Sequence, residues 1–151
     1  MKNSLNITLI QTSLFWENVE KNLSHFEKLI SEISDTDIIL LPEMFNTGFC
    51  PKSNYLAEIM EGETVTWMKE ISKTKGCAIA GTLMVKEDEK VFNRLVWVSK
   101  NGTIYTYDKH HLFSLMKEER HISKGEGRLI VTEQGWKICP LICYDLRFPV
   151  F

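Results

Sequence analysis

Features that mark nucleic-acid-binding, membrane and secreted proteins are scarce in this sequence. Its 151 residues carry a net charge of −2, so no excess of basic residues favours nucleic acid or an anionic membrane surface. No apolar run is long enough to cross a bilayer. The first residues include a short apolar stretch but lack the small-residue cleavage site of a secretion signal. We therefore expect a cytoplasmic protein whose partner is a small molecule.

The cysteine pattern argues against a disulfide framework and against a zinc finger. The sequence has four cysteines, which are Cys50, Cys77, Cys139 and Cys143. None forms a CxxC pair, and no histidine accompanies them at zinc-finger spacing. Thiols scattered through apolar segments suit a reducing cytoplasm. We therefore expect no bound metal.

The distribution of apolar residues predicts a single domain over residues 1–151, without internal repeats, low-complexity tracts or a linker. Helices are expected at residues 19–33, from an apolar stripe, and at residues 64–74. The expected strands are at residues 6–12, 38–41, 77–85, 91–99, 103–107, 128–132 and 136–142. Helices and strands alternate in the first half, and the second half is mostly β. This order predicts an α/β layered fold with helices that cover a sheet.

Three reactive side chains, Glu43, Lys109 and Cys143, each lie at the C-terminal end of an expected strand. In α/β proteins ligands bind at this edge of the sheet. Each residue has a plain structural alternative: a solvated carboxylate, an exposed charge and a small apolar core residue. Their equivalent positions favour a shared site over three separate structural roles.

These residue types permit nucleophilic catalysis without a metal or a cofactor. A thiol is a strong nucleophile only once it is deprotonated, and Glu43 is placed to accept its proton. Lys109 and the backbone N–H of Tyr144, in a sharp turn after Cys143, are suited to stabilise the oxyanion of a tetrahedral intermediate.

The alternative nucleophilic arrangement pairs Cys143 with a histidine. His110, His111 and His121 are available, but His110 and His111 are expected to point to opposite sides of an extended stretch. A zinc site is less favoured still, because no histidine pair has the i, i+4 spacing of a helical metal site.

Three segments resemble the signature motifs of the nitrilase superfamily of carbon–nitrogen hydrolases. They are "LLPEMFNTGF" (residues 40–49), "YDKHHLF" (residues 107–113) and "ICYDLRFP" (residues 142–149). The motifs occur in the family's order, and the resemblance extends from the first strand to Phe151, nearest to the omega-amidase-like branch. It implies a four-layer α-β-β-α sandwich.

The resemblance also implies a role for each matching residue. Glu43 resembles the general base, Lys109 the catalytic lysine and Cys143 the nucleophile. The family often uses a second glutamate in the loop after the lysine. Glu118 is the best match for it, and the neighbouring Glu119 is the alternative.

Phe113 and Arg147 are candidates for substrate binding. Phe113 would line the pocket, although a packing role is equally compatible with its position. The forked guanidinium of Arg147 would suit a substrate carboxylate. The alternative, which we favour, is that Asp145 and Arg147 pair with neighbours and hold the turn around Cys143.

The implied function is an amidohydrolase that cleaves the carbon–nitrogen bond of a small amide through a cysteine thioester and releases ammonia. The omega-amidase-like branch suggests an omega-amide of a 2-oxo dicarboxylic acid, 2-oxoglutaramate or 2-oxosuccinamate. The alternative is another amide, a nitrile or a carbamoyl compound, because superfamily members share the triad and differ in the pocket.

Family chains continue well past the nucleophile. We therefore expect residues 1–151 to be an incomplete carbon–nitrogen hydrolase domain that lacks the C-terminal part of the sandwich and exposes apolar surface. The alternative is a non-catalytic remnant or an interaction subunit of the same fold. The complete protein is expected to be a homodimer or a higher homo-oligomer.

Overall fold

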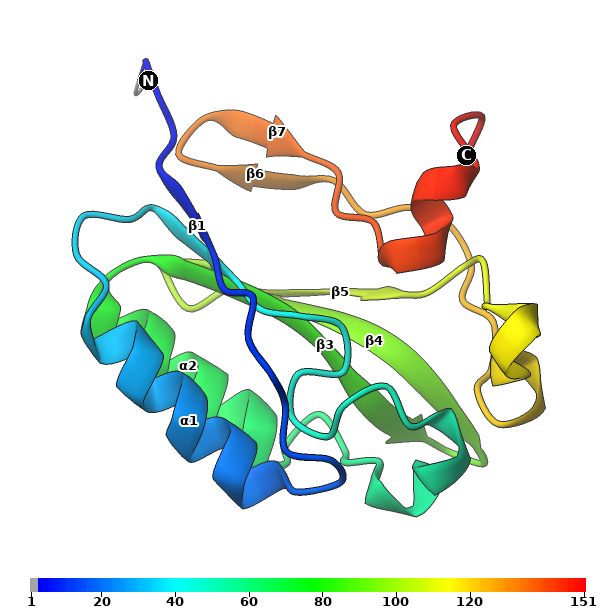
Figure 1. Ribbon diagram of the computed structural model, residues 1–151. Coiled ribbons are helices and arrows are strands. Elements are labelled where there is room, and N and C mark those ends of the chain that lie inside the picture. Colours follow the sequence, from blue (N-terminus) through cyan, green and yellow to red (C-terminus); the bar gives the residue numbers. More distant parts are fainter. Residues whose placement is uncertain (1–2) are drawn as a thin grey trace.

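The protein is built around a five-stranded mixed sheet, as seen in a computed structural model that describes residues 3–151 (Figure 1). Its strands are β1 (Ile7–Leu9), β2 (Ile38–Leu40), β3 (Ala78–Glu87), β4 (Lys90–Val98) and β5 (Ile104–Asp108). They lie in chain order. β1, β2 and β3 are parallel, whereas β4 is antiparallel to both β3 and β5. The predicted α/β class is confirmed.

One face of the sheet is covered by two neighbouring helices, α1 (Val19–Ser31) and α2 (Glu63–Lys75) (Figure 1). Asn18 caps α1 by accepting a hydrogen bond from the Lys21 N–H at 3.0 Å. The predicted apolar stripe of α1 faces the sheet, with Phe26 and Ile30 fully buried. Within the described residues, neither helix is long and apolar enough to cross a membrane.

The opposite face carries a small hairpin formed by β6 (Val131–Glu133) and β7 (Trp136–Ile138). A second apolar core lies between this hairpin and the sheet and includes Ile38 and Trp97, whereas Ile39 belongs to the core beneath the helices. β2 is therefore covered on both faces, which agrees with the absence of hydrophobic alternation in this short run.

The strand expected at residues 136–142 ends early, which corrects the prediction that a buried strand leads directly to Cys143. β7 stops at Ile138, and residues 139–142 are outside any strand. Pro140 has no N–H to donate to a ladder, and no described strand pairs with this segment. Of these residues only Ile142 is buried.

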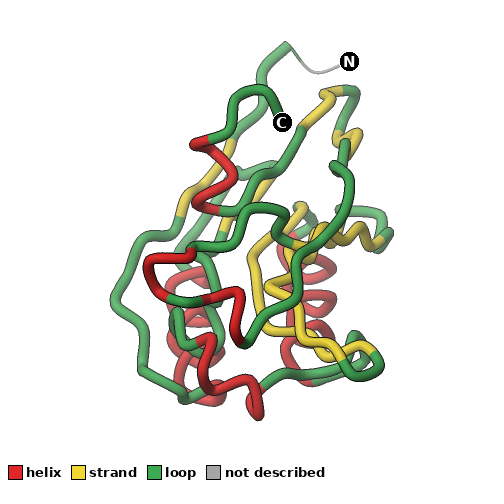
Figure 2. Tube along the Cα trace, turned by 90° about the vertical axis from the view of Figure 1, so that its right-hand side faces the viewer, coloured by secondary structure: helices red, strands yellow, loops and turns green. Residues whose placement is uncertain are grey.

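The connections on one side of the molecule contain short helical turns separated by loops, and Figure 2 looks onto this side. These turns are η1 (Pro51–Leu56), η2 (Ser114–Met116), η3 (Glu118–Arg120) and η4 (Cys143–Arg147). The loop after β5 contains two of them, η2 and η3. β4 and β5 form a hairpin whose turn contains Asn101 and Gly102, and Gly102 has a positive φ of +83°.

Candidate active site

Glu43 is held where the chain leaves β2. The next residue, Met44, is fully buried and has a left-handed φ of +48°. Its N–H donates to Thr82 Oγ1 at 2.8 Å, and the N–H of Phe45 donates to the Thr82 carbonyl at 3.1 Å. Gly81 permits this approach, because a Cβ there would lie 2.8 Å from the Phe45 ring. The turn is therefore fixed against β3, and Glu43 is fixed with it.

Lys109 directly follows β5 and is buried, with its ammonium group between two carboxylates. Nζ lies 2.7 Å from Glu43 Oε1 and 3.0 Å from Glu118 Oε2. Its backbone N–H donates to the Asn93 carbonyl at 3.0 Å, which continues the pairing of β5 with β4. The ammonium also lies 5.3 Å from the centre of the Phe49 ring. Desolvation by itself lowers the pKa of Lys109, but Glu43 and Glu118 outweigh it and raise the pKa. The lysine therefore remains a cation.

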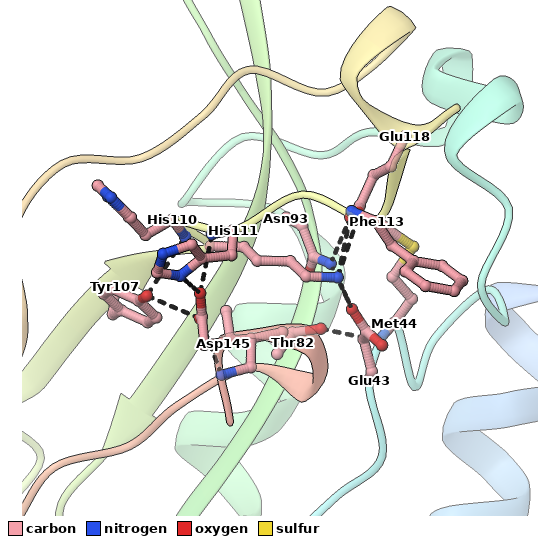
Figure 3. Close-up of polar contacts among 12 residues, drawn as sticks. Glu43, Met44, Thr82, Asn93, Tyr107, His110, His111, Phe113, Glu118 and Asp145 are labelled. Atoms are coloured by element: carbon pink, nitrogen blue, oxygen red, sulfur yellow. Dashed lines mark hydrogen bonds and ion pairs between the residues drawn. The ribbon is translucent and has the colours of Figure 1, made fainter. Parts of the chain in front are cut away.

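Glu118 lies in η3 and is fully buried, whereas Glu119 is exposed. The Glu118 carboxylate accepts hydrogen bonds from the Phe113 N–H at 2.7 Å and from Asn93 Nδ2 at 3.1 Å (Figure 3). Of the two neighbouring glutamates, the structure therefore brings Glu118 to Lys109.

Cys143 begins η4 in a conformation that side chains rarely adopt. Its φ is +43°, in the left-handed region that normally favours glycine. The residue is exposed, in contrast to the buried Lys109. Strained backbone at an exposed reactive side chain is typical of functional turns. We call residues 142–145 the nucleophile turn.

Asp145 holds the nucleophile turn and is fully buried. Its carboxylate accepts hydrogen bonds from the Tyr107 hydroxyl at 2.7 Å, the His111 N–H at 2.8 Å and the Ile142 N–H at 3.1 Å (Figure 3). It is also 2.9 Å from Nδ1 of His111. Burial and then Asp145 raise the pKa of Tyr107, which stays a donor. Asp145 therefore joins the turn to the end of β5, the strand that Lys109 directly follows.

Although Cys143 is exposed as a residue, partial desolvation of its sulfur is the largest factor in the pKa of the thiol, and it raises that pKa. The negative charge of Glu43 raises it further, and the positive charge of Lys109 opposes this increase without cancelling it. The thiol is therefore protonated at neutral pH. A reaction through its sulfur needs a base, and the structure places the Glu43 carboxylate close enough to influence the thiol.

Two cavities border Cys143. The smaller, about 300 Å³, also contacts Glu43 and Thr82. The larger, about 870 Å³, is open to solvent and is lined by Phe113, Leu115, Cys143, Tyr144, Leu146 and Arg147. Within residues 3–151, the side chain of Arg147 has neither a hydrogen bond nor an ion pair. The structure therefore supports the favoured pairing for Asp145 and not for Arg147.

The two adjacent histidines are held by structural contacts. His110 Nδ1 is 2.9 Å from the Gly125 carbonyl, and His111 binds Asp145. Their rings meet edge to face at 4.6 Å, so the prediction that they point to opposite sides is wrong. The strand has already ended at Asp108, and the alternation of a strand no longer applies.

Asn93 is the residue at this site that the sequence motifs do not indicate. It lies within β4, in a stretch that reads as an ordinary buried strand, and its amide contacts both Glu43 and Glu118. The only signal in the sequence is a polar residue within an expected strand, next to Arg94. Only the pairing of β4 with β5 shows that it faces Lys109.

A buried lysine between two glutamates, beside a cysteine in a strained turn, is an arrangement that suits chemistry by a cysteine nucleophile. The sequence pattern of the carbon-nitrogen hydrolase family matches residues 6–151, and the chain belongs to this family. Omega-amidase YafV of Escherichia coli is 39% identical over 147 residues, which are 97% of this chain and 57% of that protein. The 2-oxoglutaramate amidase of Bacillus subtilis is 35% identical over 136 residues, covering 88% of this chain and 51% of the relative.

A solved structure agrees with the fold. XC1258 from Xanthomonas campestris, described as a CN-hydrolase superfamily protein with an arsenic adduct in the active site, superposes with a TM-score of 0.94. It is 38% identical, and the match covers 97% of this chain and 56% of that one. The chain thus spans a little over half the length of the relatives that it matches.

Proposed function

We propose that this chain carries the catalytic residues of an amidohydrolase that acts through a cysteine thioester. The observation that carries the proposal is the buried cluster of Glu43, Lys109 and Glu118 beside the strained turn at Cys143. The family membership and the omega-amidase relatives support this reaction class.

In the first half of the proposed reaction, the Cys143 sulfur attacks the amide carbonyl carbon while Glu43 accepts the thiol proton. Lys109 and the Tyr144 N–H stabilise the oxyanion. Glu43 then gives the proton to the leaving nitrogen, the carbon–nitrogen bond breaks, and ammonia leaves a thioester on Cys143.

In the second half, water attacks the thioester carbonyl as Glu43 takes a proton from it. The tetrahedral intermediate collapses, the carbon–sulfur bond breaks, and the proton returns to the thiol. The carboxylic acid is the second product. Glu118 acts by keeping Lys109 charged and in place, because its carboxylate is one of the two that surround the ammonium.

The substrate that we propose is an omega-amide of a 2-oxo dicarboxylic acid, such as 2-oxoglutaramate or 2-oxosuccinamate. Arg147 lines the larger cavity beside Cys143 and has no described partner, so its guanidinium is available to a substrate carboxylate. Phe113 forms part of the same wall, 5.1 Å from Tyr144 in an edge-to-face contact.

The test measures ammonia release from these two amides by the protein and its variants. Cys143→Ala should abolish turnover, while Cys139→Ser, at another exposed cysteine, should retain it. Arg147→Gln should raise KM for 2-oxoglutaramate about tenfold or more, because a charge-assisted hydrogen bond is lost, and should leave KM for an uncharged amide unchanged. Full turnover by Cys143→Ala would exclude the thioester. An equal effect of Arg147→Gln on both substrates would exclude carboxylate recognition by this residue.

A further inference from the structure

Asn93 is buried in β4, and its side chain lies between the two carboxylates of the site (Figure 3). Nδ2 donates to Glu43 Oε1 at 2.8 Å and to Glu118 Oε1 at 3.1 Å. The backbone carbonyl of Asn93 accepts the Lys109 N–H. One neutral residue therefore contacts every charged member of the cluster.

The orientation of the Asn93 amide is determined by these carboxylates. Its nitrogen faces two oxygen acceptors, whereas Oδ1 is buried and has no hydrogen-bond partner within residues 3–151. Rotation of the amide by a half-turn would place Oδ1 against the two negatively charged groups. The amide therefore stays with its donors toward Glu43 and Glu118, at the cost of an unpaired carbonyl.

The two oxygens of the Glu43 carboxylate consequently have different surroundings. Oε1 accepts from both Lys109 Nζ, at 2.7 Å, and Asn93 Nδ2. Neither of these two bonds involves Oε2, and the Glu43 side chain also forms a hydrogen bond with the Cys143 thiol. Two donors converging on one oxygen fix the carboxylate plane, and they leave the other oxygen free to accept a proton.

We propose that Asn93 is a positioning residue that holds Oε1 of Glu43 so that Oε2 is presented to the Cys143 thiol. The inference rests on the proposed function, in which Glu43 is the base. Asn93 itself does not touch the reacting atoms. Asn93 also donates to Glu118, so a hydrogen-bond donor lies between the two carboxylates. This donor reduces the repulsion between them, because Lys109 supplies only one positive charge to balance two negative ones.

The kinetic test compares Asn93→Ala with Asn46→Ala. Asn46 is a matched control because it is equally buried, donates Nδ2 to a carboxylate, that of Glu58, and also has an unpaired Oδ1. Asn93→Ala should lower kcat about 10- to 100-fold with little change in KM, since it removes a bond to a charged group away from the substrate. Asn46→Ala should lower thermal stability and leave kcat unchanged. Equal losses of kcat in both variants would overturn the inference.

A second measurement does not depend on turnover. It follows the rate of Cys143 alkylation by iodoacetamide, read by peptide mass spectrometry, in a cycle of Asn93→Ala and Glu43→Gln. Without the amide, the charge of Glu43 is less neutralised and opposes thiolate formation more strongly. Asn93→Ala should therefore slow alkylation about threefold or more when Glu43 is present. The slowing should be clearly smaller in the Glu43→Gln background, where only the charge of Glu118 remains for the amide to neutralise.

An equal slowing in both backgrounds would show that Asn93 acts independently of Glu43 and would refute the inference. If Asn93→Ala does not fold, Asn93→Ser keeps a small polar group in the same place and serves in the cycle. Failure of the unmodified protein to release ammonia from any amide would instead count against the proposed function. The alkylation cycle would still decide the role of Asn93.

Discussion

Replacing Asp145 with alanine tests how strongly the nucleophile turn depends on one buried carboxylate. The change removes the acceptor of the Tyr107 hydroxyl and of the backbone N–H groups of His111 and Ile142. All three donors lose their acceptor in or next to the interior, because Asp145 is fully buried.

The expected magnitude follows from these bonds. Each donor left without an acceptor costs about 1–3 kcal/mol, and the sum of three is an upper bound because water entry and local movement recover part of it. Relaxation of Cys143 from its φ of +43° returns about 1 kcal/mol. We therefore expect the free energy of unfolding to fall by about 3–5 kcal/mol, as for other broken buried ionic networks.

Urea denaturation followed by circular dichroism measures this change as a lower midpoint. Asp145→Asn keeps the shape and one acceptor oxygen, so its effect should be smaller, about 1–2 kcal/mol. Glu119→Ala removes an exposed acid in the neighbouring loop and should have little effect. A loss below about 1 kcal/mol in Asp145→Ala would refute the view that this carboxylate anchors the turn.

Two further predictions concern the charge near the thiol and one glycine. Glu43→Gln should accelerate Cys143 alkylation several-fold at pH 8 and abolish amide hydrolysis. The carboxylate that raises the thiol pKa is removed, whereas the positive charge of Lys109 remains. Slower alkylation would contradict this electrostatic explanation. Gly125→Ala should lower the free energy of unfolding, measured by urea denaturation, by about 1–3 kcal/mol, because the new Cβ would lie 2.1 Å from the Asp108 carbonyl oxygen. An unchanged urea midpoint would show that the loop adjusts freely.

The main secondary structure could be predicted because the periodicity of apolar residues is a local property of the chain. The stripe of α1 and the buried run of β2 were readable in this way, and so was the hairpin between β4 and β5, whose Gly102 has a positive φ. The end of β7 was not, because the apolar run continues to Ile142. A strand also needs a partner, and residues 139–142 have none among the described strands.

The sequence by itself determined which chemical groups are available: a carboxylate after β2, a lysine after β5 and a thiol in a motif that resembles a known family. Their order along the chain was also sufficient to indicate the reaction class. These conclusions depend on residue type and spacing, which are properties of the sequence itself and need no knowledge of the fold.

Tertiary structure decided how these groups are connected. Lys109 and Glu43 are 66 positions apart, and pairing across the sheet together with the turn at Met44 brings them to 2.7 Å. The same packing buries Glu118 in place of Glu119 and directs the Asn93 amide to both carboxylates. A hydrogen bond depends on the distance and direction between side chains, and these are established only when distant segments of the chain pack together.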